Sequence, residues 1–175
     1  DNTLSSTDDF YTAYLMKVVA DVQATPKGEK PSLKKQIQNS NNGEWSTTGN
    51  VGFQLGDTVN FRLIASVPDT TRYTGGYTYT ITDTMSSGLT SNVKQATDVT
   101  IKVNDTTVLE EKYYTVTATG NTFSVNIDIL NAIKDGKMQA GNELYTYYSG
   151  VLNENAEVYD DGKENNAAHL EYSNN

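Results

Sequence analysis

The stretch GYTYTITD, residues 76–83, decides the fold class, because its apolar and aromatic residues recur at every second position. Tyr77, Tyr79 and Ile81 share one parity, and a strand with this period has one buried face. The segment TVNFRLIASV, residues 58–67, alternates in the same way. Both segments therefore predict β-strands with one side in the core.

The same period continues on both sides of these segments. Further strands are expected at 33–37, 99–103, 114–118, 123–127, 143–152 and 168–174. A helix is expected only at Ile129–Lys134, with Asp128 as its N-cap and Gly136 just past its end. Strands that recur every ~8–15 residues with turns between them predict an all-β, immunoglobulin-like Greek-key β-sandwich with at most one short helix.

Composition excludes several classes of function. The 175 residues carry a net charge of −9, which leaves no basic excess for a phosphate backbone, so we expect no nucleic-acid partner. No apolar run is long enough for membrane insertion. With no cysteine and one histidine, disulfides, thiolate sites and most zinc, haem and Ser-His-Asp sites are excluded. We expect no cofactor and no metal, and 12 tyrosines favour a β-rich extracellular protein.

A linker divides the chain into two parts. The segment TPKGEKPS, residues 25–32, holds two of the three prolines and a glycine, a composition typical of linkers. We therefore expect an N-terminal arm at 1–29 and a sandwich domain at 30–175. The apolar run Phe10–Ala24 predicts a strand that either pairs with the edge of the sandwich or belongs to a preceding domain.

Three polar residues fall on parities that should point into the core. Lys35 lies between two inward apolar positions, Asp83 extends the series that starts at Tyr77, and Asn174 extends the last strand. Each would be costly to bury alone. Either the three side chains lie at strand ends and reach water, or they meet one another inside the domain.

Several blocks of the sequence are similar to one family. PSLKKQI (31–37) and the following GDTVNF (56–61) resemble the opening of the isopeptide-forming domains of Gram-positive sortase-assembled pilins and surface adhesins. Later blocks resemble the same family in the same order: SVPDTTRYTGGYTYTITDTMSSGLT (66–90), GNELYTYYSGVLNENA (141–156) and NNAAHLEYSNN (165–175). The resemblance covers roughly residues 30–175.

This resemblance implies an intramolecular crosslink between Lys35 and Asn174, with Asp83 as the catalytic acid. Burial disfavours the charged amine, so the lysine becomes a neutral nucleophile. A buried carboxyl group that stays protonated polarises the carboxamide and passes protons to the leaving ammonia. Because some relatives use a glutamate from a different strand, Glu143 is the alternative acid.

The linker carries a second lysine of interest. In pilus shaft proteins, a motif ending in tyrosine-proline-lysine-asparagine precedes such a domain, and its lysine is joined by sortase to the next subunit. VADVQATPKG (19–28) has the proline and Lys27, but Thr25 and Gly28 stand where the motif has tyrosine and asparagine. The resemblance makes Lys27 the candidate intersubunit lysine.

The resemblance therefore implies a structural module of a bacterial surface pilus. Its partners would be other pilin subunits linked by sortase, and it would be no enzyme beyond a single autocatalytic turnover. The alternative is an adhesin domain that binds a host matrix protein or a glycan. In that case Trp45 would stack on the glycan, whereas otherwise it anchors its loop on the core.

Overall fold

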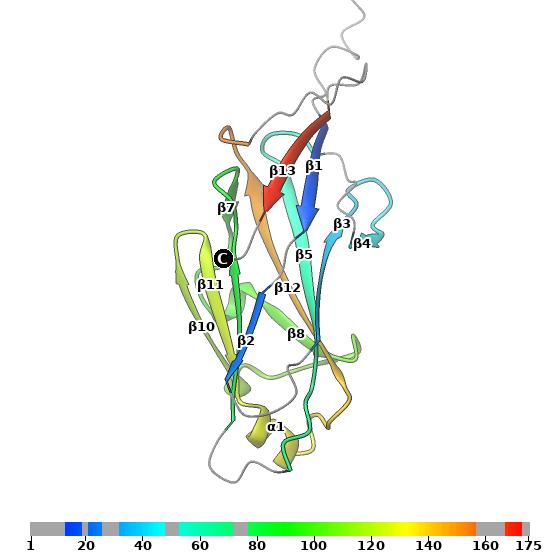
Figure 1. The fold of residues 1–175 in the computed structure, drawn as a ribbon, viewed down its shortest axis with the longest axis vertical. Helices are drawn as coiled ribbons and strands as arrows, with labels where there is room; N and C mark the ends of the chain where they lie inside the picture. Colours follow the sequence, from blue (N-terminus) through cyan, green and yellow to red (C-terminus); the bar gives the residue numbers. More distant parts are fainter. Residues whose placement is uncertain are drawn as a thin grey trace, which may run out of the picture.

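The computed structural model describes residues 13–18, 21–25, 32–47, 53–71, 77–156 and 167–172. Two antiparallel sheets pack face to face in an elongated β-sandwich (Figure 1). The expected all-β sandwich is therefore confirmed. Within the described ranges, no helix is long and apolar enough to cross a membrane.

The larger sheet contains seven strands. Its main path runs β4 (Trp45–Ser46), β3 (Leu33–Gln38), β5 (Thr58–Ser66), β12 (Glu143–Leu152), β8 (Thr100–Val103) and β9 (Thr107–Val108). The last strand, β7 (Leu89–Ser91), pairs with the C-terminal end of β12. The long central pair β5–β12 thus connects the N-terminal strand β3 to the rest of the sheet.

The smaller sheet contains four strands and faces the first. Its order is β10 (Tyr114–Thr119), β11 (Thr122–Ile127), β6 (Thr78–Thr84) and β2 (Asp21–Thr25). A separate parallel pair joins β1 (Ala13–Val18) to β13 (Ala167–Tyr172). The strand β6 therefore lies in the middle of its sheet, with a neighbour on each side.

The short connections follow from local sequence. The expected helix is present as α1 (Ile129–Lys134), with the Asp128 side chain accepting a hydrogen bond from the Asn131 amide. Asn104 and Asp105 both have positive φ, 52° and 55°, which suits the tight turn between β8 and β9. Two single 3₁₀ turns, Ala96–Asp98 and Glu111–Tyr113, complete the described helical residues.

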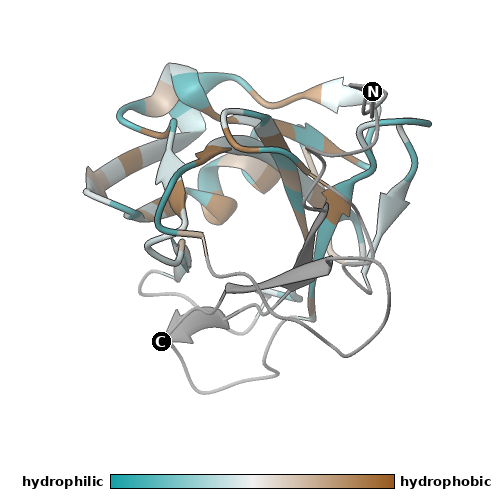
Figure 2. Cartoon of the chain, turned by 90° about the horizontal axis from the view of Figure 1, so that it is seen from above, coloured by the Kyte–Doolittle hydropathy of each residue, from teal (hydrophilic) through white to brown (hydrophobic). Residues whose placement is uncertain are grey.

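The core lies between the two sheets and follows the period-two pattern. In β12 every second residue is buried, while its neighbours are partly exposed. Figure 2 shows hydrophobic and hydrophilic residues alternating along the strands. The fully buried side chains come from both sheets and include Phe61, Leu63, Tyr79, Ile81, Phe123 and Ile127.

Part of the expected N-terminal arm is a strand of the sandwich. β2 pairs with β6 in antiparallel register from Asp21 opposite Thr82 to Thr25 opposite Thr78. The proposed boundary between residues 29 and 30 stays a prediction, because residues 26–31 lie outside the described part of the chain.

Candidate functional site

Strand β3 of the larger sheet places Lys35 in the core between the two sheets. Lys35 lies opposite Leu63 of β5, and its residue is 3% exposed. The burial pattern of β3 alternates, with Lys35 and Ile37 buried and Gln36 between them partly exposed. The lysine therefore occupies a core position in a strand whose inward parity the sequence predicts.

Strand β6 of the opposite sheet supplies the partner of this lysine. Asp83 lies beside Phe123 of β11 and is 0% exposed. The Lys35 Nζ atom donates a hydrogen bond of 2.8 Å to Oδ1 of Asp83. Neither side chain reaches water at a strand end. Lys35 and Asp83 meet inside the domain, which is the second of the two alternatives that the sequence left open.

Aromatic rings surround the pair. The Lys35 Nζ atom lies 5.2 Å from the ring centroid of Phe61 and 5.7 Å from that of Tyr148. Tyr148 stacks on Phe61 at 5.5 Å and meets Phe123 edge-on at 4.8 Å. The two charged groups thus lie in an apolar enclosure, with the Tyr148 hydroxyl hydrogen-bonded to Asp83.

Burial changes the protonation of the site. Desolvation lowers the pKa of Lys35 from 10.5 to about 7, although the Asp83 carboxylate opposes this shift. Desolvation also raises the pKa of Tyr148 well above its ordinary value, and the nearby Asp83 adds to the effect. Burial therefore favours the uncharged, nucleophilic form of the amine.

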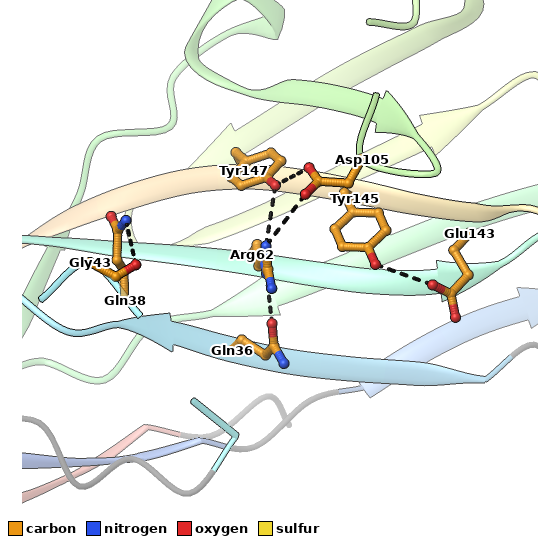
Figure 3. Close-up of polar contacts among 8 residues, drawn as sticks. All are labelled: Gln36, Gln38, Gly43, Arg62, Asp105, Glu143, Tyr145 and Tyr147. Atoms are coloured by element: carbon orange, nitrogen blue, oxygen red, sulfur yellow. Dashed lines mark hydrogen bonds and ion pairs between the residues drawn. The ribbon is translucent and has the colours of Figure 1, made fainter. Parts of the chain in front are cut away.

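The other residues expected at the site fall into two groups. Asn174 and Lys27 lie outside the described residues. Glu143 begins β12 on the outer parity, is exposed, and accepts a hydrogen bond of 3.2 Å from the Tyr145 hydroxyl (Figure 3). The structure therefore brings Asp83, and not Glu143, to Lys35.

The sequence analysis did not identify the aromatic rings around Lys35 as part of the site, although the sequence contains a signal for them. Phe61 falls on the buried parity of β5, and Tyr148 falls on the buried parity of β12. Alternation alone places both in the core, but it does not show that they meet Lys35. That information comes from the pairing of Tyr148 with Phe61 across β5 and β12.

Trp45 does not anchor its loop on the core, contrary to one of the expectations above. It lies on β4, remains partly exposed, and meets Tyr147 edge-on at 5.6 Å. The Arg62 guanidinium lies over its ring at 4.6 Å. Arg62 and Tyr147 both alternate with buried residues, so Trp45 packs on the outer face of the larger sheet.

Comparison with known proteins identifies the fold. No family model matches the chain, and no curated protein matches it in sequence. Among solved structures, the pilus backbone protein RrgB of Streptococcus pneumoniae matches with a TM-score of 0.55 and 25% identity, over 74% of this chain and 48% of that one. The fold is that of Gram-positive backbone pilins.

Two further pilins share this fold at lower identity. The major pilin BcpA of Bacillus cereus matches with a TM-score of 0.53 and 15% identity, over 75% of this chain and 32% of BcpA. The major pilin SpaA of Corynebacterium diphtheriae matches with a TM-score of 0.53 and 13% identity, over 83% and 38%. This chain spans less than half the length of each of these pilin structures.

Proposed function

We propose that this chain is a structural module of a bacterial surface pilus, stabilised by an isopeptide bond that the domain forms between Lys35 and Asn174. The observation that carries the proposal is the Lys35–Asp83 pair, enclosed in the core at 2.8 Å. The pilin fold supports the structural role. The structure of the major pilin SpaA, which has this fold, is described as pointing to a modular pilus assembly and stabilizing isopeptide bonds.

The proposed reaction replaces the carboxamide of Asn174 by an amide to Lys35 and releases ammonia. A proton moves from the Lys35 ammonium to Asp83 across their hydrogen bond and leaves a neutral amine and a neutral acid. The amine attacks Cγ of Asn174 while the Asp83 hydroxyl hydrogen-bonds to the carboxamide oxygen. Asp83 then helps to move a proton from the attacking nitrogen to the leaving one. The C–N bond of the carboxamide breaks, ammonia leaves, and the acid is regenerated.

The enclosure favours this reaction in two ways. Phe61, Tyr148 and Phe123 exclude water, so the acid and the amine interact at low dielectric and hydrolysis does not compete. Burial of an ion pair also costs desolvation free energy, which the attraction between the two charges offsets only in part. Conversion of the amine into a neutral secondary amide removes that penalty.

The crosslink suits a protein that transmits tension. It would join β3 to the C-terminal end of the chain, so a pulling force would load a covalent bond before it separated the strands. We further propose that sortase links the module to other pilin subunits on the cell surface, with Lys27 as the acceptor amine. The domain would catalyse its own single reaction and no other.

Peptide mapping tests the proposed bond. Trypsin does not cleave after a lysine whose side chain is an amide, so the digest should contain a branched peptide that joins the Lys35 segment to the segment with Asn174. Tandem mass spectrometry should locate the branch at these two residues. The neighbouring exposed lysine, Lys34, is the internal control and should remain cleavable. Complete cleavage after Lys35 in the folded protein would contradict the proposal.

A further inference from the structure

A pocket of about 370 Å³ lies on the outer face of the larger sheet, with β5 and β12 as its floor. Five of its lining residues lie on the outer face, namely Trp45, Tyr147, Gln38, Asn60 and Ser149, and the inward residues Phe61 and Tyr148 complete the lining. The crosslinking site lies on the other side of the same sheet, since Lys35 points into the core. The proposed pilus function leaves this pocket without a role.

The two aromatic walls are held in place by their neighbours. Trp45 and Tyr147 meet at 5.6 Å with an interplanar angle of 73°. Arg62 lies over one face of Trp45, with its guanidinium 4.6 Å from the ring centroid. The indole is thus held between Arg62 and Tyr147, and it lines the pocket.

Two cations lie beside the pocket: Lys102, whose Nζ is 5.3 Å from the centroid of the Tyr147 ring, and Arg62, which is paired with a carboxylate. The Arg62 guanidinium donates to Gln36 Oε1 at 2.6 Å and to the Tyr147 hydroxyl at 3.4 Å, and it lies 3.8 Å from the Asp105 carboxylate (Figure 3). The Tyr147 hydroxyl also donates to Asp105. Because the Asp105 carboxylate compensates Arg62, this arginine offers little attraction to an anion such as phosphate or a carboxylated sugar.

The amide wall is ordered by a tight turn. Gln38 donates to the carbonyl of Gly43 at 3.1 Å, and Asn60 donates to Gln38 Oε1 at 3.3 Å. Gly43 has a φ of +72°, which a residue with a Cβ adopts only with strain. These bonds use one N–H of each amide, and a carboxamide carries two. The second N–H of each remains able to bind a ligand hydroxyl.

We propose that this pocket binds a neutral saccharide. One face of a pyranose ring presents C–H groups that pack on an aromatic ring, while its hydroxyl groups exchange hydrogen bonds with amides and serine. Trp45 and Tyr147 supply the aromatic surface, and Gln38, Asn60 and Ser149 supply the polar partners. The site gives the domain an adhesive role that does not depend on the crosslink.

Tryptophan fluorescence tests this proposal directly, because Trp45 is the only tryptophan of the chain. The full chain should be titrated with lactose, N-acetyllactosamine and chitobiose, with 3′-sialyllactose as the anionic comparison. We expect a saturable change in emission for at least one neutral probe, with a dissociation constant in the millimolar range. Asn60→Ala should weaken that binding about three- to tenfold, the loss of one hydrogen bond.

Two controls separate binding at the pocket from other effects. Asn126→Ala makes the same change at an exposed position of β11 in the other sheet and should leave the affinity unchanged. Trp45→Ala, followed by calorimetry, should abolish binding while circular dichroism stays that of the wild type. No saturable response to any neutral probe, a stronger response to 3′-sialyllactose, or equal affinity in Asn60→Ala and wild type would each overturn the proposal.

Discussion

The Nζ atom of Lys35 lies 2.8 Å from Oδ1 of Asp83, and the two side chains are 1% and 0% exposed. They come from facing sheets, so the pair bridges the interior of the sandwich. Replacement of a buried ion pair by apolar side chains is often neutral or stabilising, so stability alone gives weak grounds for keeping it. Its geometry suits a reaction in which one group attacks and the other supplies a proton.

Asp83 should be the acid of this reaction. Asp83→Asn keeps the size of the side chain but removes the acidic proton, so Lys35 should stay unmodified and the intact mass should equal that of the sequence. Glu143→Gln is the matched control, because Glu143 is exposed on the outer face of the sheet. Its product should be crosslinked like the wild type. A crosslinked Asp83→Asn protein would assign the acid to another residue.

Loss of the crosslink should lower the thermal stability. A bond between residues 35 and 174 closes a loop of 174 − 35 = 139 residues. By analogy with a disulfide, this closure stabilises the fold by about 5 kcal/mol. Asn174→Ala should therefore melt roughly 10–20 °C below the wild type in calorimetry. Asn175→Ala should melt with the wild type; an equal loss in both variants would attribute the effect to the terminus and not to the bond.

Stability without the crosslink should depend on pH through Lys35. Its pKa is lowered to about 7 in the folded chain, against 10.5 when exposed. Between these values the unfolded state binds more protons than the folded state, so the free energy of unfolding rises with pH, by up to about 1.4 kcal/mol per unit. Below about pH 7 this contribution is flat, because both states are protonated.

Denaturant titrations from pH 6 to pH 9 measure this dependence. Asn174→Ala should gain stability from pH 7 to pH 9. The double variant Lys35→Met/Asn174→Ala should lack that gain, and so should the crosslinked wild type, in which the lysine is an amide. A gain of the same size in the double variant would show that other groups cause it.

Amide hydrogen exchange should distinguish the two arrangements expected for the N-terminal arm, pairing with the sandwich or membership of a preceding domain. β2 pairs with β6 over five residues, so the amides of Asp21–Thr25 that donate to β6 should exchange slowly with deuterium. The helix α1 provides an internal reference for protected amides. Rapid exchange throughout Asp21–Thr25, together with proteolysis in that segment, would indicate an arm that does not belong to the sandwich.

Period-two alternation predicted most of the fold. The strand at Glu143–Leu152 and the helix at Ile129–Lys134 are present with the expected bounds. The two-residue strands β4 and β9 and the three-residue strand β7 were not predicted, because so few residues cannot display a period. They form because the longer strands β3, β8 and β12 offer them an edge or an end to pair with.

The candidate site was predictable only in part. Parity placed Lys35 and Asp83 in the core. Their contact could not be predicted, because the two residues are 48 positions apart in the sequence and meet only through the way the two sheets face one another. The enclosure by Phe61 and Tyr148 depends on strand register, which alternation leaves open. The expectation that Trp45 anchors its loop on the core was wrong for a related reason, since a two-residue strand shows no parity of its own.

The intact mass of the folded wild-type protein tests the central claim most directly. Formation of one amide between Lys35 and Asn174 releases one ammonia, so the protein should weigh about 17 Da less than its sequence. The deficit should persist after denaturation and should be absent from Lys35→Ala, which lacks the nucleophile. A well-folded wild-type protein with the full mass of its sequence would contradict the account.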